Sequence, residues 1–305
     1  DDKHILWNDS EKSVTVSKDS TKINLKVDSK TAYVNGSPVS LDVAPVNYKN
    51  RVYIPARFVS QSLGKKVAWD GASSSVIIRD EKDFNSVKDI LDKTNKAMAN
   101  VTKLKLNFDG TVSVAASGKN IDTDVKGSGE IDIAQKKMHM LMNMKMSGQD
   151  IKVDTYITNK GAYLLNPLTN KWQNIPVNQE LLDKSFQNNG GTINLEATDT
   201  LAAGLVADTT GTDEIVLKGD VYMGELFKTL SQNVPLDGVK FNKLYMEIHI
   251  DKKTYYTTKA NAEIAIDVNA NTDKGSQKSS VNEKINFNYS DYNGDVNITL
   301  PDDIK

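Results

Sequence analysis

The chain has 305 residues, a length typical of about two domains, and its 38 basic and 40 acidic residues leave a formal net charge of −2. This balance argues against a nucleic-acid-binding protein, because neutralising phosphates requires a cationic excess. The sequence has no cysteine, which excludes disulfides, thiolate metal sites and cysteine nucleophiles, and no run of about 18 apolar residues that would predict a membrane-spanning helix.

An internal repeat is the first feature along the chain. A tryptophan is followed after seven residues by a valine in two strand-like segments, at Trp7 and Val14 and again at Trp69 and Val76. The copies are 62 residues apart (69 − 7 = 62), so we expect one supersecondary unit to be used twice. We also expect the chain to begin partway through a repeat, with any export signal or anchor lying outside it.

The segment between the two copies predicts a small module of strands and one helix. Asn35-Gly36 is a turn signal, because both residues tolerate positive φ, and Gly64 is a helix-ending glycine. The predicted elements are a hairpin within residues 22–34, a strand at 51–54, a helix over 56–63, and two short strands at 67–69 and 75–79.

The motifs of this module are similar to those of the copper amine oxidase N-terminal-like domain, which recurs on Gram-positive cell surfaces. The resemblance implies a domain over residues 1–82, with a truncated first repeat, that corresponds to the stalk of those oxidases and not to their catalytic domain. Arg57 recurs in that family, and we expect it to form a buried ion pair between helix and sheet; binding of anionic wall polymer by Arg51 and Arg57 is the alternative. The motifs are Val34-Asn35-Gly36, Ala44-Pro45, Arg51-Val52-Tyr53-Ile54-Pro55-Ala56-Arg57-Phe58, Leu63-Gly64 and Val67-Ala68-Trp69-Asp70.

A second region follows a short charged segment, residues 80–83, which we expect to be a linker. Apolar residues at helical spacing, after Asp83 as N-cap, then predict an amphipathic helix: Phe84, Val87, Leu91, Met98 and Val101. Alternation predicts strands at 103–115, 122–134, 136–147, 150–159, 239–250, 253–268, 278–290 and 295–300, with short helices near 179–187, 196–206 and 221–230. This order predicts one large antiparallel sheet with helices on one face.

This layout is similar to the LolA-like lipoprotein-carrier fold, and so are the hairpin at 163–172 and the closing segment at 287–301. The resemblance implies an α+β fold class, in which residues 83–305 form a curved half-barrel. Its helices would lie on the concave face and enclose an apolar cavity.

The residues present argue against catalysis. Amine oxidation requires copper held by three imidazoles and a tyrosine-derived quinone, whereas the chain has only His4, His139 and His249, without a His-x-His pair. There is no Gly-x-Ser-x-Gly elbow, and Gly127-Ser128-Gly129 lacks the spacing of a phosphate-binding loop. We therefore expect no enzymatic activity, no cofactor and no metal, and we expect His249 to face solvent.

Five of the eight methionines alternate along one predicted strand, so all five project from one face. Three interpretations remain: core packing under the helices, a deformable apolar wall for a lipid-like ligand, and a thioether site for Cu(I) assisted by His139. His139 has the opposite parity and should point from the other face, which disfavours copper. With the next strand, the candidate ligand-binding residues are Met138, Met140, Met142, Met144, Met146, Ile151, Val153 and Ile157.

The sequence thus predicts a non-enzymatic, extracellular protein associated with the bacterial cell surface, whose half-barrel binds a hydrophobic or lipid-like ligand. The alternative is a structural or adhesive envelope protein that binds cell-wall polymer or protein and no small molecule. The two differ in whether the protein's own side chains fill the concave face.

Overall fold

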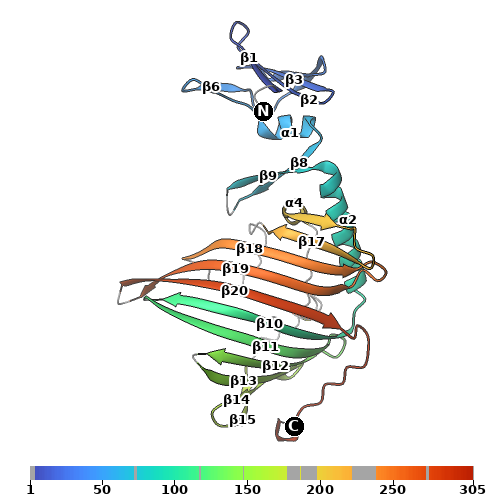
Figure 1. Cartoon of the computed structure of the whole chain (residues 1–305), viewed down its shortest axis with the longest axis vertical. Coiled ribbons are helices and arrows are strands. Elements are labelled where there is room, and N and C mark those ends of the chain that lie inside the picture. Colours follow the sequence, from blue (N-terminus) through green and yellow to red (C-terminus); the bar gives the residue numbers. More distant parts are fainter. Residues whose placement is uncertain are drawn as a thin grey trace. The chain divides into compact units, whose positions relative to one another are not determined.

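The computed structural model describes residues 4–71, 74–116, 118–146, 148–176, 186, 198–221, 238–272 and 275–304. The chain divides into two compact units (Figure 1). The first unit comprises residues 1–70 and 74–85, and the second comprises residues 71–73 and 86–305.

The first unit is built on a five-stranded antiparallel sheet in which neighbours in sequence are neighbours in space. One apolar face of this sheet forms the core around Ile23 and Leu25. Phe58, Val59 and Leu63, from and beside a short helix, pack against it. The elements are β1 Ile5–Asn8, β2 Ser13–Lys18, β3 Thr21–Lys26, β4 Thr31–Val34, β5 Ser37–Ser40, β6 Val46–Tyr48, β7 Arg51–Tyr53, α1 Ala56–Ser62, β8 Lys65–Asp70 and β9 Ser75–Asp80.

Two predictions about turns in this unit are confirmed. Asn35 and Gly36 have φ of 50° and 84°, which is the positive-φ pair that a tight hairpin turn requires. Gly64 has φ of 71°, and its amide donates to the carbonyl of Gln61, so it ends α1 in the left-handed conformation. The expected buried ion pair of Arg57 is wrong: its side chain is exposed on α1 and has no ion pair within the described residues.

The repeat seen in the sequence is a repeated hairpin. Trp7 pairs with Val14 across β1 and β2, and Trp69 pairs with Val76 across β8 and β9. The register is therefore the same in both copies. The prediction of one supersecondary unit used twice is confirmed for this hairpin.

No linker separates β9 from the next helix. Asp80 is the last residue of β9, and α2 (Glu81–Met98) begins at once, so the charged segment is its first turn and Asp83 is not an N-cap. Acidic residues in a first turn stabilise a helix through its dipole. The five predicted apolar residues are all buried, although the last of them lies beyond the helix: Phe84, Val87, Leu91, Met98 and Val101.

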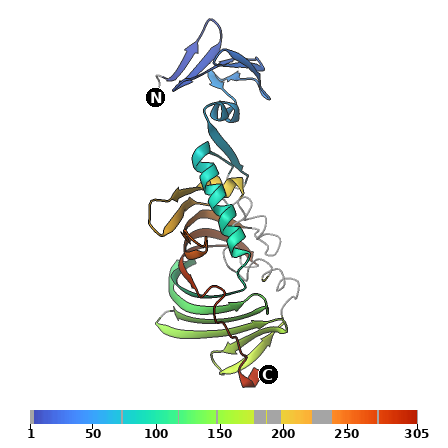
Figure 2. The ribbon, with the colours of Figure 1, turned by 90° about the vertical axis from the view of Figure 1, so that its right-hand side faces the viewer.

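The second unit contains an 11-stranded antiparallel sheet that does not close into a barrel. Two meanders meet in its middle, where β10 pairs with β20, and Figure 2, viewed nearly along the strands, shows that the sheet is curved. The strands are β10 Lys103–Ala116, β11 Lys119–Asp132, β12 Lys137–Met146, β13 Gln149–Thr158, β14 Gly161–Asn166, β15 Lys171–Ile175, β16 Leu205–Asp208, β17 Glu214–Asp220, β18 Val239–Asp251, β19 Thr257–Thr272 and β20 Gly275–Ser290.

The structure differs from the predicted elements in three places. Residues 205–208, at one edge of the sheet, and 214–220, beside them, are strands that the sequence patterns did not reveal. Of the described part of the predicted 196–206 helix, only Asp199–Gly204 is helical (α4). Residues 295–300 are not a strand, although Val296 and Ile298 are buried, because alternation reports burial rather than pairing. The helices predicted near 179–187 and 221–230 lie almost entirely outside the described residues. A 3-10 turn, Asp302–Ile304, follows near the end of the chain.

Candidate ligand-binding face

The eight candidate residues all lie on one face of β12 and β13. Met138 pairs with Ile157, Met142 with Val153, and Met144 with Ile151. Cross-strand partners share a face, and residues two apart along a strand do too. We call this face the apolar wall, defined by Met138, Met140, Met142, Met144, Met146, Ile151, Val153 and Ile157.

Two glycines on β11 leave the sheet without side chains beside the apolar wall. Gly127 pairs with Met142 and Gly129 with Met140. A Cβ atom on Gly127 would lie 2.5 Å from Cζ of Phe108, and one on Gly129 would collide with Sδ of Met140. The glycines therefore let the ring of Phe108 and the side chain of Met140 lie close over the backbone of β11.

Burial of the wall changes along β12. Met138, Met140 and Met142 pack, with Ile157, against a core that includes Leu104, which is fully buried. At the other end Met144 is half-buried and Met146 is 40% exposed, and Ile121 on the same face of β11 is 44% exposed. One end of the wall is thus packed by the protein itself and the other end is open to solvent.

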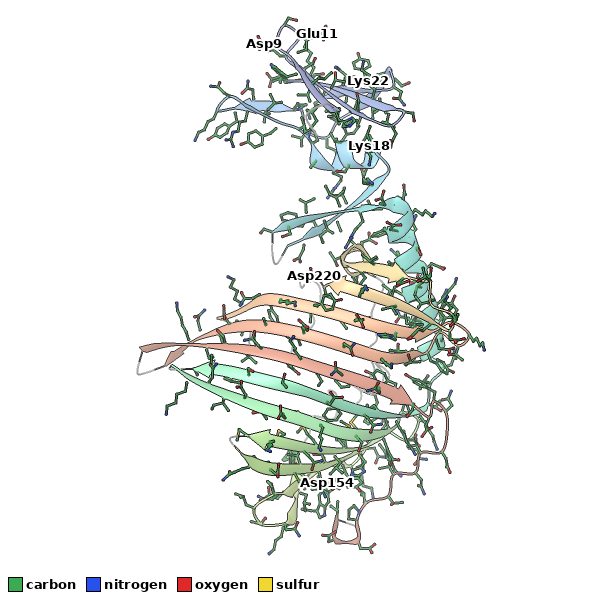
Figure 3. The ribbon with its side chains drawn as sticks, in the orientation of Figure 1. Asp9, Glu11, Lys18, Lys22, Asp154 and Asp220 are labelled. Atoms are coloured by element: carbon green, nitrogen blue, oxygen red, sulfur yellow. The ribbon has the colours of Figure 1, made fainter. Side chains whose placement is uncertain are left out.

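His139 projects from the opposite face, as its parity predicts. Its ring stacks on Tyr156 with centroids 4.0 Å apart and planes 8° apart, and its Nε2 lies 2.9 Å from Oδ1 of Asp154 (labelled in Figure 3). Burial and the nearby carboxylates of Asp154 and Glu130 raise the pKa of Tyr156. These contacts hold the imidazole away from the methionines, which removes it from the proposed thioether site.

His249 does not face solvent freely, contrary to the prediction. Its Nδ1 lies 2.7 Å from Oε2 of Glu214, and its Nε2 lies 2.9 Å from Oε1 of Glu247. The imidazole side chain is only 18% exposed. The pattern around His249 indicated the outward face of β18 correctly, but not the carboxylates that neighbouring positions bring to it.

A buried hydroxyl lies on the inner side of α2. Thr94 is buried, and its Oγ1 has no hydrogen-bond partner within the described residues. Leaving a buried polar atom unpaired costs about 1–3 kcal/mol. Such an atom is a place where the polar group of a guest molecule or a water gains a hydrogen bond.

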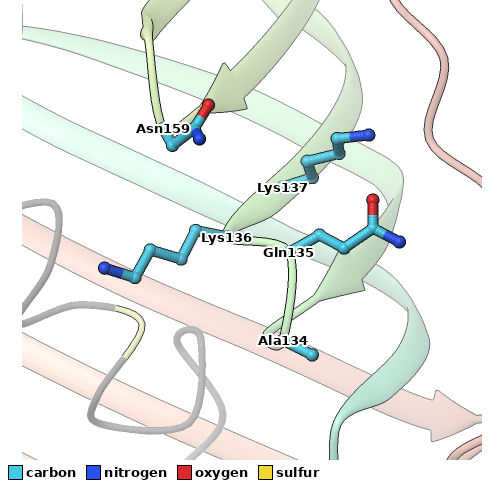
Figure 4. Close-up of a pocket in the computed structure, with 5 residues that line it drawn as sticks. All are labelled: Ala134, Gln135, Lys136, Lys137 and Asn159. Carbon is cyan, nitrogen blue, oxygen red and sulfur yellow. The ribbon is translucent and has the colours of Figure 1, made fainter.

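A polar pocket of about 490 Å³ flanks the packed end of the wall. It lies between the β11–β12 turn and the β13–β14 turn, next in sequence to the pair Met138 and Ile157. Figure 4 shows the side chains of Gln135 and Lys137 on one side of the turn and that of Lys136 on the other. The lining residues are Ala134, Gln135, Lys136, Lys137 and Asn159.

The described residues lack two kinds of feature. No group of three or more His, Cys, Asp or Glu side chains is placed to hold a metal ion in these parts of the chain. No described helix has the length and apolar character needed to cross a membrane.

The glycines of β11 are the site residues that the sequence did not reveal. From the sequence, Gly127-Ser128-Gly129 was considered only as a phosphate-binding loop, whose spacing it lacks. The useful signal was its position: glycines two apart in an alternating strand share one face and leave it without side chains.

Comparisons with known proteins identify both parts of the sequence. The model of the copper amine oxidase N-terminal domain matches residues 2–78, which confirms the resemblance of the motifs. A model described as a family of unknown function (DUF6612) matches residues 86–305. No curated protein matches the chain.

Several solved structures share a distant likeness with the chain. LprF from Mycobacterium bovis is 12% identical with a TM-score of 0.37, over 71% of this chain and 97% of that one. A putative outer membrane lipoprotein-sorting protein domain from Vibrio parahaemolyticus is 11% identical with a TM-score of 0.24, over 73% and 95%. A lipovitellin structure concerned with lipid–protein interactions is 11% identical with a TM-score of 0.29, over 66% and 26%.

Proposed function

The chain belongs to the family of unknown function DUF6612, and we propose that its second unit is a non-enzymatic binding module for a hydrophobic or lipid-like ligand. The ligand lies along the apolar wall. The motifs of the first unit support a location outside the cell, associated with the bacterial surface, where cell-wall material is a further partner.

The open end of the wall is the observation that carries this proposal. Met144, Met146 and Ile151 stand in register on one face, and water reaches them. Apolar surface in water is unfavourable, so a guest that covers it is bound by the hydrophobic effect. Methionine suits a guest of variable shape, because its unbranched side chain repacks easily.

The wall is long enough to hold an acyl chain. Met138 to Met146 span nine residues of one strand, or roughly 27 Å at about 3.4 Å per residue. Burying about ten methylenes contributes roughly 8 kcal/mol at about 0.8 kcal/mol each, before the cost of association. A binding free energy of this size corresponds to a dissociation constant in the micromolar range.

The pocket at the β11–β12 turn fits the polar end of such a ligand. It adjoins the apolar pair Met138 and Ile157 and presents an amide from Gln135 and the ammonium groups of Lys136 and Lys137. Lys137, on the same side of the turn as Gln135, favours an anionic headgroup over a cationic one. The hydroxyl of Thr94 offers a further hydrogen bond inside the unit.

The packed end of the wall supports the second candidate, a structural or adhesive envelope protein without a small-molecule ligand. Met138, Met140 and Met142 contact the protein's own core there. In that case the open end at Met146 is exposed apolar surface and nothing more.

Titration with an environment-sensitive fatty-acid dye decides between the two candidates. Wild-type protein is expected to take up the dye, and Met144→Lys to weaken its binding at least about tenfold, which is about 1.4 kcal/mol. Asn143→Lys is the matched control, because it adds the same charge at the next position but on the opposite face. It is expected to keep wild-type affinity.

Native mass spectrometry and lipid extraction, on protein purified from its own host, identify the ligand. Anionic and neutral amphiphiles then compete with the dye, and the anionic ones are expected to compete better. If the wild-type protein carries no lipid and takes up no dye, the binding module is refuted and the envelope protein takes its place.

A further inference from the structure

The two copies of the repeated hairpin match at every apolar position of one face. At an offset of 62 residues, each apolar residue of β1–β2 has an apolar counterpart in β8–β9 with the same cross-strand partner. The pairs of equivalent positions are Ile5 and Val67, Trp7 and Trp69, Val14 and Val76, and Val16 and Ile78. Both hairpins therefore present the same kind of surface.

The two copies differ in what covers that surface. In the first copy β3 lies along β2, with Val14 opposite Leu25 and Val16 opposite Ile23. Both valines are only 7% exposed, because they lie in the core against which Phe58 and Val59 of α1 pack. In the second copy Val76 is 50% exposed and Ile78 is 47% exposed. Within the described residues, β8 and β9 form a sheet of two strands, with no third strand along β9.

The two faces of the second hairpin differ in burial. Ala68 and Ile77, on one face, are buried, and α1 contacts β8. Trp69, Val76 and Ile78, on the other face, are exposed. A strand with an apolar face and an open edge is a template for pairing with another chain.

We propose that β8–β9 is a second copy of the β1–β2 docking element, and that it accepts the β3 edge of a second copy of this chain. The first hairpin shows what the face is built to contact: a strand with Ile23 and Leu25 in cross-strand positions and the core behind it. The second chain offers this edge when its own β1–β2 hairpin is released. The contact is a hairpin exchange, which is a low-cost route to assembly.

The first hairpin defines the register of the exchange. Ser17 lies opposite Lys22 and Ser13 opposite Lys26, so residue 79 of one chain pairs with residue 22 of the other, and residue 75 with residue 26. A chain's own β1–β2 hairpin is favoured by its high effective concentration. Wild-type protein is therefore expected to be mainly monomeric when dilute, and exchange is expected when β1–β2 is weakened.

Four full-length proteins test the exchange by sedimentation or light scattering. Val14→Lys with Val16→Lys weakens the first hairpin and is expected to cause concentration-dependent assembly. Val76→Lys with Ile78→Lys removes the exposed apolar face of β8–β9, and this variant is expected to stay monomeric, like the dilute wild type. The quadruple variant is expected to be monomeric. If the V14K/V16K variant stays monomeric, or if the quadruple variant assembles equally, the proposal fails.

Engineered disulfides keep the test decisive if the weakened hairpin unfolds the first unit. The chain has no cysteine of its own, so any bridge joins the introduced residues. With oxidised glutathione added as the oxidant, mixing Arg79→Cys with Lys22→Cys in the V14K/V16K protein is expected to give a covalent dimer, whereas mixing it with Lys26→Cys in the same protein is not. Equal cross-linking of both positions, or of neither, contradicts the proposed register.

Discussion

Phe108 and Gly127 are cross-strand partners on β10 and β11, and the phenyl ring lies where a side chain on residue 127 would begin. The same ring lies 6.0 Å from that of Phe287, centroid to centroid, on the neighbouring strand β20. A missing side chain on β11 thus permits an aromatic contact at the seam between the two meanders. The same glycine pairs with Met142, so this contact adjoins the packed end of the apolar wall.

Gly127→Ala should destabilise the second unit. The new Cβ would lie 2.5 Å from Cζ of Phe108 and closer still to the carbonyl oxygen of Leu141, so ring and backbone must both move. Overpacking of this kind costs about 1–3 kcal/mol of unfolding free energy, measurable by denaturant titration. Ser128→Ala, an exposed neighbour on the other face, should change it by less than about 0.5 kcal/mol. Equal unfolding free energies for Gly127→Ala and the wild type would show that β11 tolerates a side chain at residue 127.

The stacked pair His139 and Tyr156 should stabilise the sheet without affecting the ligand. A double-mutant cycle with His139→Ala and Tyr156→Ala is expected to give a coupling of about 0.5–1.5 kcal/mol, the range for aromatic pairs. Because both rings point away from the apolar wall, dye affinity should stay at the wild-type level. A loss of affinity like that of Met144→Lys would mean that the outer face takes part in binding.

Tyr289→Phe should make the second unit more resistant to alkali. Burial raises the pKa of Tyr289 well above the usual tyrosine value of about 10. Above that pH the unfolded chain releases the phenolic proton while the folded chain keeps it, so stability falls as pH rises. Denaturation followed from pH 9 to pH 12 should show a shallower fall for Tyr289→Phe than for wild type, and the same fall in both would contradict this account.

Tyr292→Phe provides a second test of the same effect. Burial, followed by the neighbouring Tyr289 and Tyr256, raises the pKa of Tyr292 as well. Its hydroxyl also donates to the carbonyl of Thr257. This variant should lose some stability at neutral pH through the missing hydrogen bond, yet it should show a shallower alkaline fall.

Local patterns in the sequence determined the strands and the faces of the second unit. Strict alternation placed the five methionines on one face and His139 on the other, because successive side chains of a strand point to opposite sides. The same rule failed at 295–300, where Val296 and Ile298 are buried without a strand partner. Residues 205–208, at the edge, and 214–220, beside them, were missed because short strands owe their form to the neighbours they pair with.

The repeat shows most clearly where sequence information ends. Seven-residue spacing predicted that one unit is used twice, and the structure pairs Trp7 with Val14 and Trp69 with Val76 in the same register. Only the tertiary structure decided that Val14 is buried and Val76 is exposed, since Val14 lies in the core against which α1 packs and Val76 does not. Burial is a property of the partners that a face meets, and local sequence specifies the face but not the partner. The apolar wall follows the same rule: its residues were evident from alternation, and the tertiary contacts left one end packed and the other open.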